Sequence, residues 1–222
     1  MPHKNNLIIE PFETNCCIVY IAACLYLSVK PYFFTIWLVE NITVWLFLIL
    51  ILYIRIRHCQ FSKISLFLIT VASVLHTIGG HYGFSNVPLG KCLIFFGEQG
   101  RNNFDRMGHF FCGTLIYVIL DVSIKKRIFT NNMLMYCFAF FAMTGIAGIY
   151  ELLEWLDFII AEKEHAELFL GDTINPWDPH ADILNCVIGS ICALICFIMF
   201  NKRTTNTSPK RTAAINTRKN AI

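Results

Sequence analysis

Residues with metal-binding side chains recur near one end of several apolar stretches of this sequence. Three are histidines and three are aspartates, namely His76, His81, His109, Asp105, Asp178 and Asp182. Neutral imidazole nitrogen and carboxylate oxygen suit zinc, iron or manganese, and no thiolate accompanies them as in most structural zinc sites. These residue types predict a site for a divalent transition metal.

Spacing along the chain favours convergence of these groups. Asp105 and His109 are four residues apart, and Glu151 and Glu154 are three apart, so each pair shares one face of a helix. Glu151 or Glu154 is our candidate general base for a metal-bound water. Arg106 is our candidate for steadying an anionic group of a substrate.

The expected position of His81 depends on the glycine pair in front of it. On a regular helix His76 and His81 would diverge. We expect Gly79-Gly80 to end the helix and to let His81 fold back toward His76.

A structural role is the simpler interpretation of each residue taken alone. Asp178 precedes Pro179 as a helix cap does, and Asp105 could cap in the same way. Arg106 could only neutralise a carboxylate. The metal hypothesis rests on the number of such groups, because a charge within hydrocarbon costs about 2.5 to 3.5 kcal/mol and therefore usually pairs or binds something.

Composition indicates the elements that position these residues. Apolar residues make up 56% and charged residues 15% of the 222 positions, a balance that favours a membrane over water. A spanning helix needs roughly 20 mainly apolar residues. Six stretches approach that length: 15–30, 32–54, 64–78, 107–122, 133–160 and 183–200. The sequence predicts an all-α, polytopic transmembrane bundle forming one domain over residues 1–200.

The distribution of basic residues predicts the orientation of the bundle. With six spans both termini lie on one side. Thirteen Lys and Arg residues fall on that side and five on the other, together the 18 of the sequence, so we expect both termini to be cytoplasmic. The metal-binding groups then lie at the outer face. Residues 201–222 are expected to form a basic, disordered cytoplasmic tail.

Several stretches give the chain a resemblance to a known family. They are Leu75 to Tyr82 with Val87-Pro88, Arg101 to Arg106 with His109-Phe110 and Gly113, Tyr150-Glu151 with Glu154-Trp155, and Gly171-Asp172 with Trp177-Asp178 and Asp182. In these the chain resembles the YjdF-type bacterial inner-membrane protein family, which carries a domain of unknown function. The resemblance implies placement in a bacterial inner membrane and importance of the polar cluster, and it implies no activity.

Three functions are compatible with this pattern. The leading hypothesis is a metal-dependent membrane hydrolase acting on a lipid-linked or periplasmic small molecule. The alternatives are a transporter of metal ions or of a proton-coupled solute, with helices broken at Gly145, Gly148 and Gly79-Gly80, and a noncatalytic assembly protein. The net charge of +3 is too small to suggest a nucleic-acid partner, whereas the lipid bilayer is an expected one.

Overall fold

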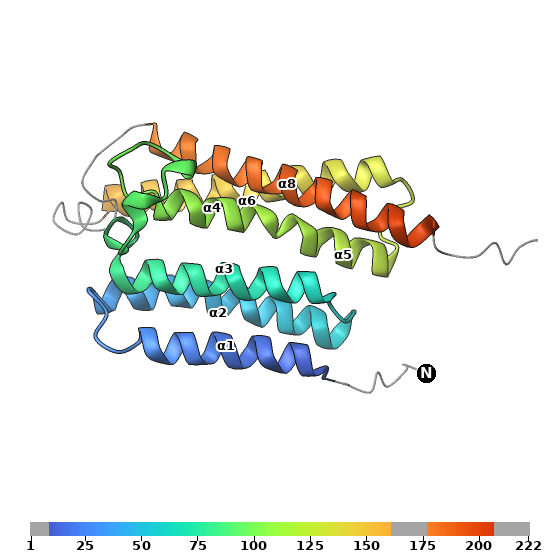
Figure 1. Ribbon diagram of the computed structural model, residues 1–222, viewed down its shortest axis with the longest axis horizontal. Coiled ribbons are helices and arrows are strands. Elements are labelled where there is room, and N and C mark those ends of the chain that lie inside the picture. The colour runs from blue at the N-terminus through green and yellow to red at the C-terminus, as the bar shows by residue number, and fades with distance from the viewer. Residues whose placement is uncertain (1–8, 161–176, 207–222) are drawn as a thin grey trace, which may run out of the picture.

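The computed structural model describes residues 9–160 and 177–206, and every regular element in these ranges is a helix. The predicted all-α class is therefore confirmed (Figure 1). The α-helices are α1 (Pro11–Leu27), α2 (Phe34–Arg57), α3 (Lys63–Tyr82), α4 (Phe104–Thr114), α5 (Ile116–Lys126), α6 (Asn132–Ile160) and α8 (Asp178–Asn206). Three short 3-10 turns, η1 (Phe84–Asn86), η2 (Gly90–Cys92) and η3 (Ile94–Phe96), connect α3 to α4.

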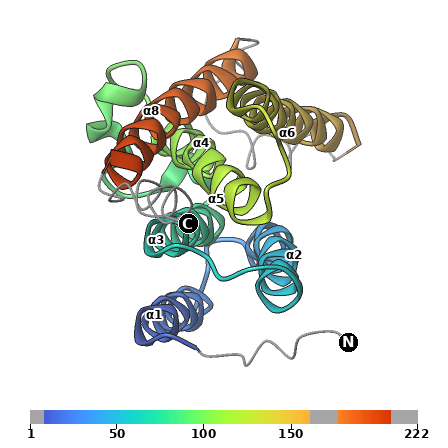
Figure 2. The ribbon, with the colours of Figure 1, turned by 90° about the vertical axis from the view of Figure 1, so that its right-hand side faces the viewer.

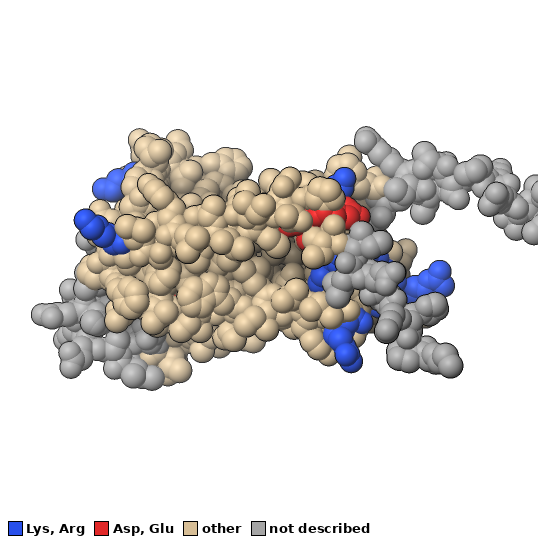
Figure 3. All heavy atoms as spheres, turned by 90° about the horizontal axis from the view of Figure 1, so that it is seen from below, with Lys and Arg blue, Asp and Glu red and all other residues tan. Residues whose placement is uncertain are grey.

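Five helical stretches are long and apolar enough to cross a membrane, and they correspond to the last five predicted spans. They are α2, α3, α4 with α5, most of α6 and most of α8. α1 is apolar but has only 17 residues, or roughly 25 Å at 1.5 Å per residue. On the face seen in Figure 3, Lys, Arg, Asp and Glu lie at the two ends of the molecule and leave a wide band between them without such residues, as a bilayer requires.

The helices alternate in direction, so that α1 begins and α8 ends at the same end of the bundle (Figure 1). α8 continues to Asn206, past the residue where the basic tail was expected to begin. Residues 207–222 of that tail and the Gly171-Asp172 stretch lie outside the described residues.

The glycine pair in α3 does not end the helix, contrary to expectation. α3 continues to Tyr82 and ends before Gly83, which has a positive φ of 70°. A Cβ atom at Gly80 would lie only 3.0 Å from Cβ of Glu40. The pair therefore allows close packing against α2 and the following turn, and His81 stays on the helix.

The expected breaks at Gly145 and Gly148 are also absent. Both residues lie inside α6, which runs for 29 residues without interruption. A break does occur at Leu115, between α4 and α5, where the Leu115 N–H donates to the carbonyl of Cys112 at 2.9 Å. This i to i+3 hydrogen bond marks a tighter turn within the fourth span.

α4 and α5 occupy the centre of the bundle, with α2 and α3 on one side and α6 and α8 on the other (Figure 2). The side chains of Ile116 and Leu120 on α5 are fully buried. The core continues through Met135 and Ala139 of α6 and Cys186 of α8. A central helix that contacts both groups of helices can position residues toward either side.

α4 and α8 pack backbone to backbone. A Cβ atom at Gly113 would overlap the carbonyl oxygen of Cys186, and one at Gly189 would overlap the carbonyl oxygen of Phe110. The Ser190 hydroxyl donates to the Gly113 carbonyl at 3.1 Å. Small residues at such an interface let two membrane helices approach closely, and the contact fixes the register of α4 against α8.

Two asparagines fix the start of α4. The Asn102 side chain donates to the carbonyls of Ser85 and Val87 at 2.9 and 3.0 Å, and it accepts the Phe104 N–H. Asn103 is fully buried and donates to the Glu98 carbonyl at 2.9 Å. These bonds satisfy the backbone of an irregular connection and hold the first turn of α4 in place.

The orientation of the bundle is testable with reporter fusions. Arg55, Lys63 and Lys125 lie near helix termini at the end where α1 begins, and the positive-inside rule places that end in the cytoplasm. Alkaline phosphatase needs an oxidising compartment for its disulfides. We expect it to be active when fused after Lys91 and inactive when fused after Arg127. A fluorescent protein that folds only in the cytoplasm should give the reverse result, and the opposite pattern for both reporters would invert the topology.

Substitution of Gly189 by Ala should destabilise the packing of α4 and α8. The added methyl would overlap the Phe110 carbonyl, and such overpacking costs about 1 to 3 kcal/mol. We expect a lower midpoint of thermal unfolding in detergent. Gly145→Ala is the matched control, because a Cβ atom there meets nothing within 4 Å. Equal midpoints for the two variants would show that the close contact is not a constraint.

Candidate metal centre

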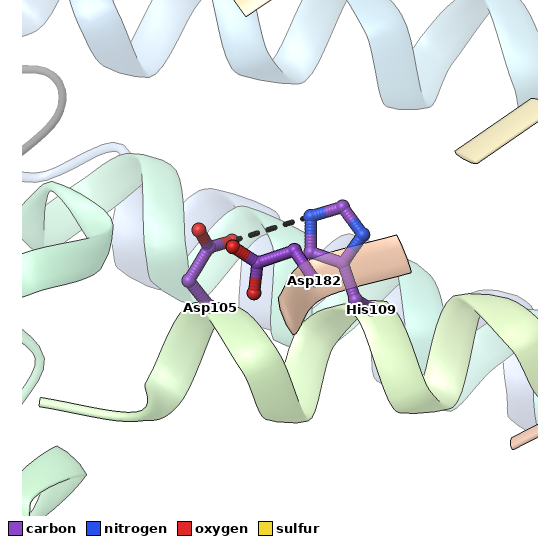
Figure 4. Close-up of side chains that lie close together, drawn as sticks. All are labelled: Asp105, His109 and Asp182. Carbon is purple, nitrogen blue, oxygen red and sulfur yellow. Dashed lines mark ion pairs between the residues drawn. The ribbon is translucent and has the colours of Figure 1, made fainter. Parts of the chain in front are cut away.

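α4 and α8 bring three of the predicted metal ligands together. Candidate ligand atoms of Asp105, His109 and Asp182 all lie within 4.8 Å of one another. Figure 4 shows Asp105 and His109 projecting from α4 toward the carboxylate of Asp182 from α8. The dashed line joins His109 Nε2 to Asp105 Oδ1, which are 3.7 Å apart. One nitrogen and two carboxylate groups are a donor set that suits a divalent transition metal.

Two buried carboxylate oxygens beside this group have no hydrogen-bond partner among the described residues. They are Asp182 Oδ1 and Glu151 Oε1. Glu151 Oε1 lies 3.0 Å from His109 Nε2, but the two atoms are not aligned for a hydrogen bond. A buried acceptor without a partner costs about 1 to 3 kcal/mol. A cation between Asp182 Oδ1 and the imidazole would remove that cost for Asp182, and a water on the cation could donate to Glu151 Oε1.

A small polar cavity adjoins the three residues. Its volume is about 50 Å³, which is room for roughly three or four water molecules. It is lined by five carboxylates and one guanidinium group, from Asp105, Glu151, Glu154, Asp178, Asp182 and Arg101. Carboxylates this close repel one another unless protons or a cation neutralise them, so the cavity favours a cation.

Asp178, another predicted ligand, is bound by two arginines. Arg101 donates to Asp178 Oδ2, and Arg106 donates to Asp178 Oδ1 at 3.3 Å. This supports the interpretation of Arg106 as the partner of a carboxylate. The Nε atoms of both arginines are buried without a hydrogen-bond partner in the described part of the chain. Of the two, Arg101 lines the small cavity and retains a donor for an anionic group.

His76 belongs to a second polar network beside the candidate metal centre. His76 Nε2 lies 2.6 Å from Glu40 Oε2, and the Tyr150 hydroxyl donates to the same oxygen at 3.1 Å. The Tyr150 ring lies between the two networks, with ring centroids 6.0 Å from His76 and 5.9 Å from His109. The structure thus brings His76 near the site and binds its Nε2 to a carboxylate.

His81 lies in a different environment from the other predicted ligands. Its Nδ1 is 2.7 Å from the carbonyl oxygen of Leu27, at the end of α1, and its ring contacts Tyr82. The His81 carbonyl also accepts the Tyr32 N–H at 2.9 Å. His81 therefore joins α3 to the connection between α1 and α2, and the structure does not bring it to the three ligand residues.

Sequence reasoning missed the contributions of Arg101 and Tyr150. Arg101 was counted as a topology signal and as part of a family motif, and Tyr150 only as part of a family motif, and neither was given a role in the site. The available signal for Arg101 was its place four residues before Asp105, within the connection that leads into the site. The signal for Tyr150 was its place beside Glu151 on the polar end of an apolar helix.

Comparison with known proteins gives one family and one relative. The model of the family described as predicted membrane protein (DUF2238) matches residues 13–203. The inner membrane protein YjdF of Escherichia coli (strain K12) is 25% identical over 168 residues, which cover 75% of this chain and 79% of that protein. No solved structure matches. The family match covers nearly all of the helical bundle, and the chain belongs to the DUF2238 family of predicted membrane proteins.

Proposed function

We propose that this protein is a metal-dependent hydrolase of a bacterial inner membrane. The observation that carries the proposal is the convergence of Asp105, His109 and Asp182 with two buried carboxylate oxygens that have no hydrogen-bond partner among the described residues. The inner-membrane placement is supported by the name of the Escherichia coli relative.

Asp105, His109 and Asp182 would hold one zinc, iron or manganese ion. Three protein ligands leave a coordination position for water, which is the arrangement of a catalytic rather than a structural metal site. The metal would lower the pKa of that water and so supply a hydroxide nucleophile. The adjoining cavity gives the water and the reacting group a place beside the metal.

Glu151 would act as the general base. Its unpartnered Oε1 lies beside His109 Nε2, next to the proposed metal position. The water oxygen would bond to the electrophilic atom of an ester while the bond to the leaving oxygen breaks. Glu151 would accept the proton of the water and return it to the leaving oxygen. Glu154 lines the same cavity and is the second candidate base.

Hydrolysis is preferred to transport because of the lining of the adjacent space. Inward of Asp105, His109 and His76, the larger cavity between the helices has no charged side chain among its lining residues. A transported ion or proton needs polar groups across the whole membrane. Flux of metal ions into proteoliposomes would favour transport over hydrolysis.

Removal of a proposed ligand should abolish metal binding. We expect purified wild-type protein to bind about one equivalent of zinc, iron or manganese, and His109→Ala and Asp182→Asn to weaken affinity by about 100-fold or more, since even outer-shell changes cost 10 to 100-fold. Metal content by mass spectrometry and competition with a chelator measure this. His81→Ala is the control, because His81 contacts Leu27 instead. Folded wild-type protein that binds none of these metals would refute the proposal.

Substitution of Glu151 by Gln should separate metal binding from catalysis. The amide keeps the shape of the side chain but is not a base, so we expect metal content to remain and hydrolysis to fall by about 100 to 10,000-fold. The assay is a panel of phosphate and carboxylic esters in detergent micelles. Glu154→Gln is measured beside it to test the second candidate. If Glu151→Gln only lowers thermal stability and no ester is hydrolysed by the wild type, the assembly role is preferred.

A further inference from the structure

A long apolar groove extends from the candidate metal centre along the helices. Its volume is about 600 Å³, within the range of ligand sites. Its lining residues come from α2, α3, α4, α5 and α6 and from the connection between α5 and α6. Its apolar lining includes Phe47 and Ile54 of α2, Val118 and Val122 of α5, and Met143 of α6. Such a surface, with only a few hydroxyl groups among apolar side chains, fits hydrocarbon better than a polar solute.

The groove and the small polar cavity meet at the candidate metal centre. Phe84 and Asp105 line both spaces. His76, His109 and Tyr150 line the same end of the groove. A molecule with an apolar chain in the groove would therefore place its polar end between the proposed metal and the small cavity.

The groove is longer than one leaflet of a bilayer. Its lining runs from Asp105 to Ser123 along α4 and α5. At 1.5 Å per residue this segment is roughly 27 Å long. Half of the hydrocarbon core of a bilayer, the depth that one lipid chain occupies, is about 15 Å. The groove can therefore accommodate one lipid chain along its whole length.

The groove is open to the side of the bundle. Leu50 on α2 and Phe138 and Ile146 on α6 line it and keep 54%, 53% and 50% of their surface exposed. All three belong to membrane-spanning stretches. A lipid chain can therefore enter from the bilayer between α2 and α6.

Two groups at the polar end could bind an anionic headgroup. Arg101 lines the small cavity, and its Nε has no hydrogen-bond partner within the described ranges. A metal ion on Asp105, His109 and Asp182 would offset the nearby carboxylates and leave a position for a phosphate oxygen. A guanidinium group and a metal ion together recognise phosphate.

We propose that the groove binds one hydrocarbon chain of a lipid that carries a phosphate, with the phosphate at the candidate metal centre. This inference rests on the proposed function and names its substrate class. Binding of the chain depends on the groove alone and can be measured without turnover.

Gly108 offers a way to fill the groove without disturbing the fold. It lines the groove next to His109, and a Cβ atom at this position meets nothing within 4 Å. Gly108→Leu should place a side chain where the lipid chain would pass. Gly145→Leu is the matched control, since Gly145 also lies within a helix with open space around it but does not line the groove.

The probe is phosphatidic acid with a photoreactive diazirine at the end of one acyl chain, at low mole fraction in phosphatidylcholine nanodiscs. We expect labelling at Val118 and Ile119, which line the groove roughly 20 Å along α4 and α5 from Asp105. Excess unlabelled phosphatidic acid should compete, whereas extra phosphatidylcholine should not. Gly108→Leu should reduce deep labelling roughly tenfold, as expected when about two methylene groups lose burial, and Gly145→Leu should leave it unchanged.

Labelling spread evenly over the outer helix faces, or equal in Gly108→Leu and wild type, would overturn the inference. Crosslinks between the groove and a second copy of the chain would also overturn it, because they would indicate a protein interface. Metal content is measured on the same samples. Deep labelling that unlabelled lipid competes away, in protein without metal, would refute the proposed hydrolase and leave the lipid site standing. Bound metal without such labelling would refute the lipid site and leave the proposed hydrolase standing.

Discussion

The backbone contact between α4 and α8 determines where the functional groups lie. Gly113 and Gly189 permit the two helices to touch without an intervening side chain. Asp105 and His109 precede Gly113 on one helix, and Asp182 precedes Gly189 on the other. A larger separation would move the two aspartates apart and open the small cavity. The packing of two glycines, four to eight residues away from the ligands, thus sets the geometry of the candidate metal centre.

The bilayer explains why so many polar groups in the bundle are paired. In hydrocarbon a polar side chain without a partner is costly, so it must bind another group of the protein. Glu40 meets His76 and Tyr150, Asp178 meets two arginines, and at the other end Asp121 accepts hydrogen bonds from Ser62 and Ser65. Buried side-chain atoms without a hydrogen-bond partner among the described residues also occur elsewhere, as at Tyr20, Trp37 and Ser73. What distinguishes Asp182 Oδ1 and Glu151 Oε1 is that two carboxylate oxygens of this kind lie beside one imidazole.

Hydrophobicity along the chain was sufficient to predict the helices and the depth of the polar residues in the membrane. Depth in a membrane follows from position along a span, so His109, Glu151 and Asp182 were expected at one level, where the structure has them. The direction in which each residue points depends on neighbouring helices and was not predictable in this way. His81 was therefore expected in the cluster but contacts Leu27, and the pairing of Asp178 with Arg101 was not foreseen.

Glycine was the residue type whose role was hardest to predict. The same residue can end a helix, bend it, or allow a neighbour to approach, and only the surroundings decide among these roles. Gly79-Gly80 was expected to end α3, but the pair packs closely against the side chains of Phe84 and Glu40. Gly145 was expected at a break, but α6 is continuous there. Within the described helices a break lies at Leu115, where the tightened turn from Cys112 to Leu115 includes Gly113, a glycine that was not expected at a break.

The sideways opening between α2 and α6 affects the energetics of any lipid that binds there. Moving one methylene group from hydrocarbon into water costs about 0.8 kcal/mol, so extracting a whole chain through the aqueous phase would be prohibitive. A chain that slides between Leu50 and Ile146 exchanges one apolar environment for another and avoids that cost. Encounter would then be diffusion in two dimensions, and occupancy would follow the mole fraction of the lipid in its leaflet rather than its concentration in solution.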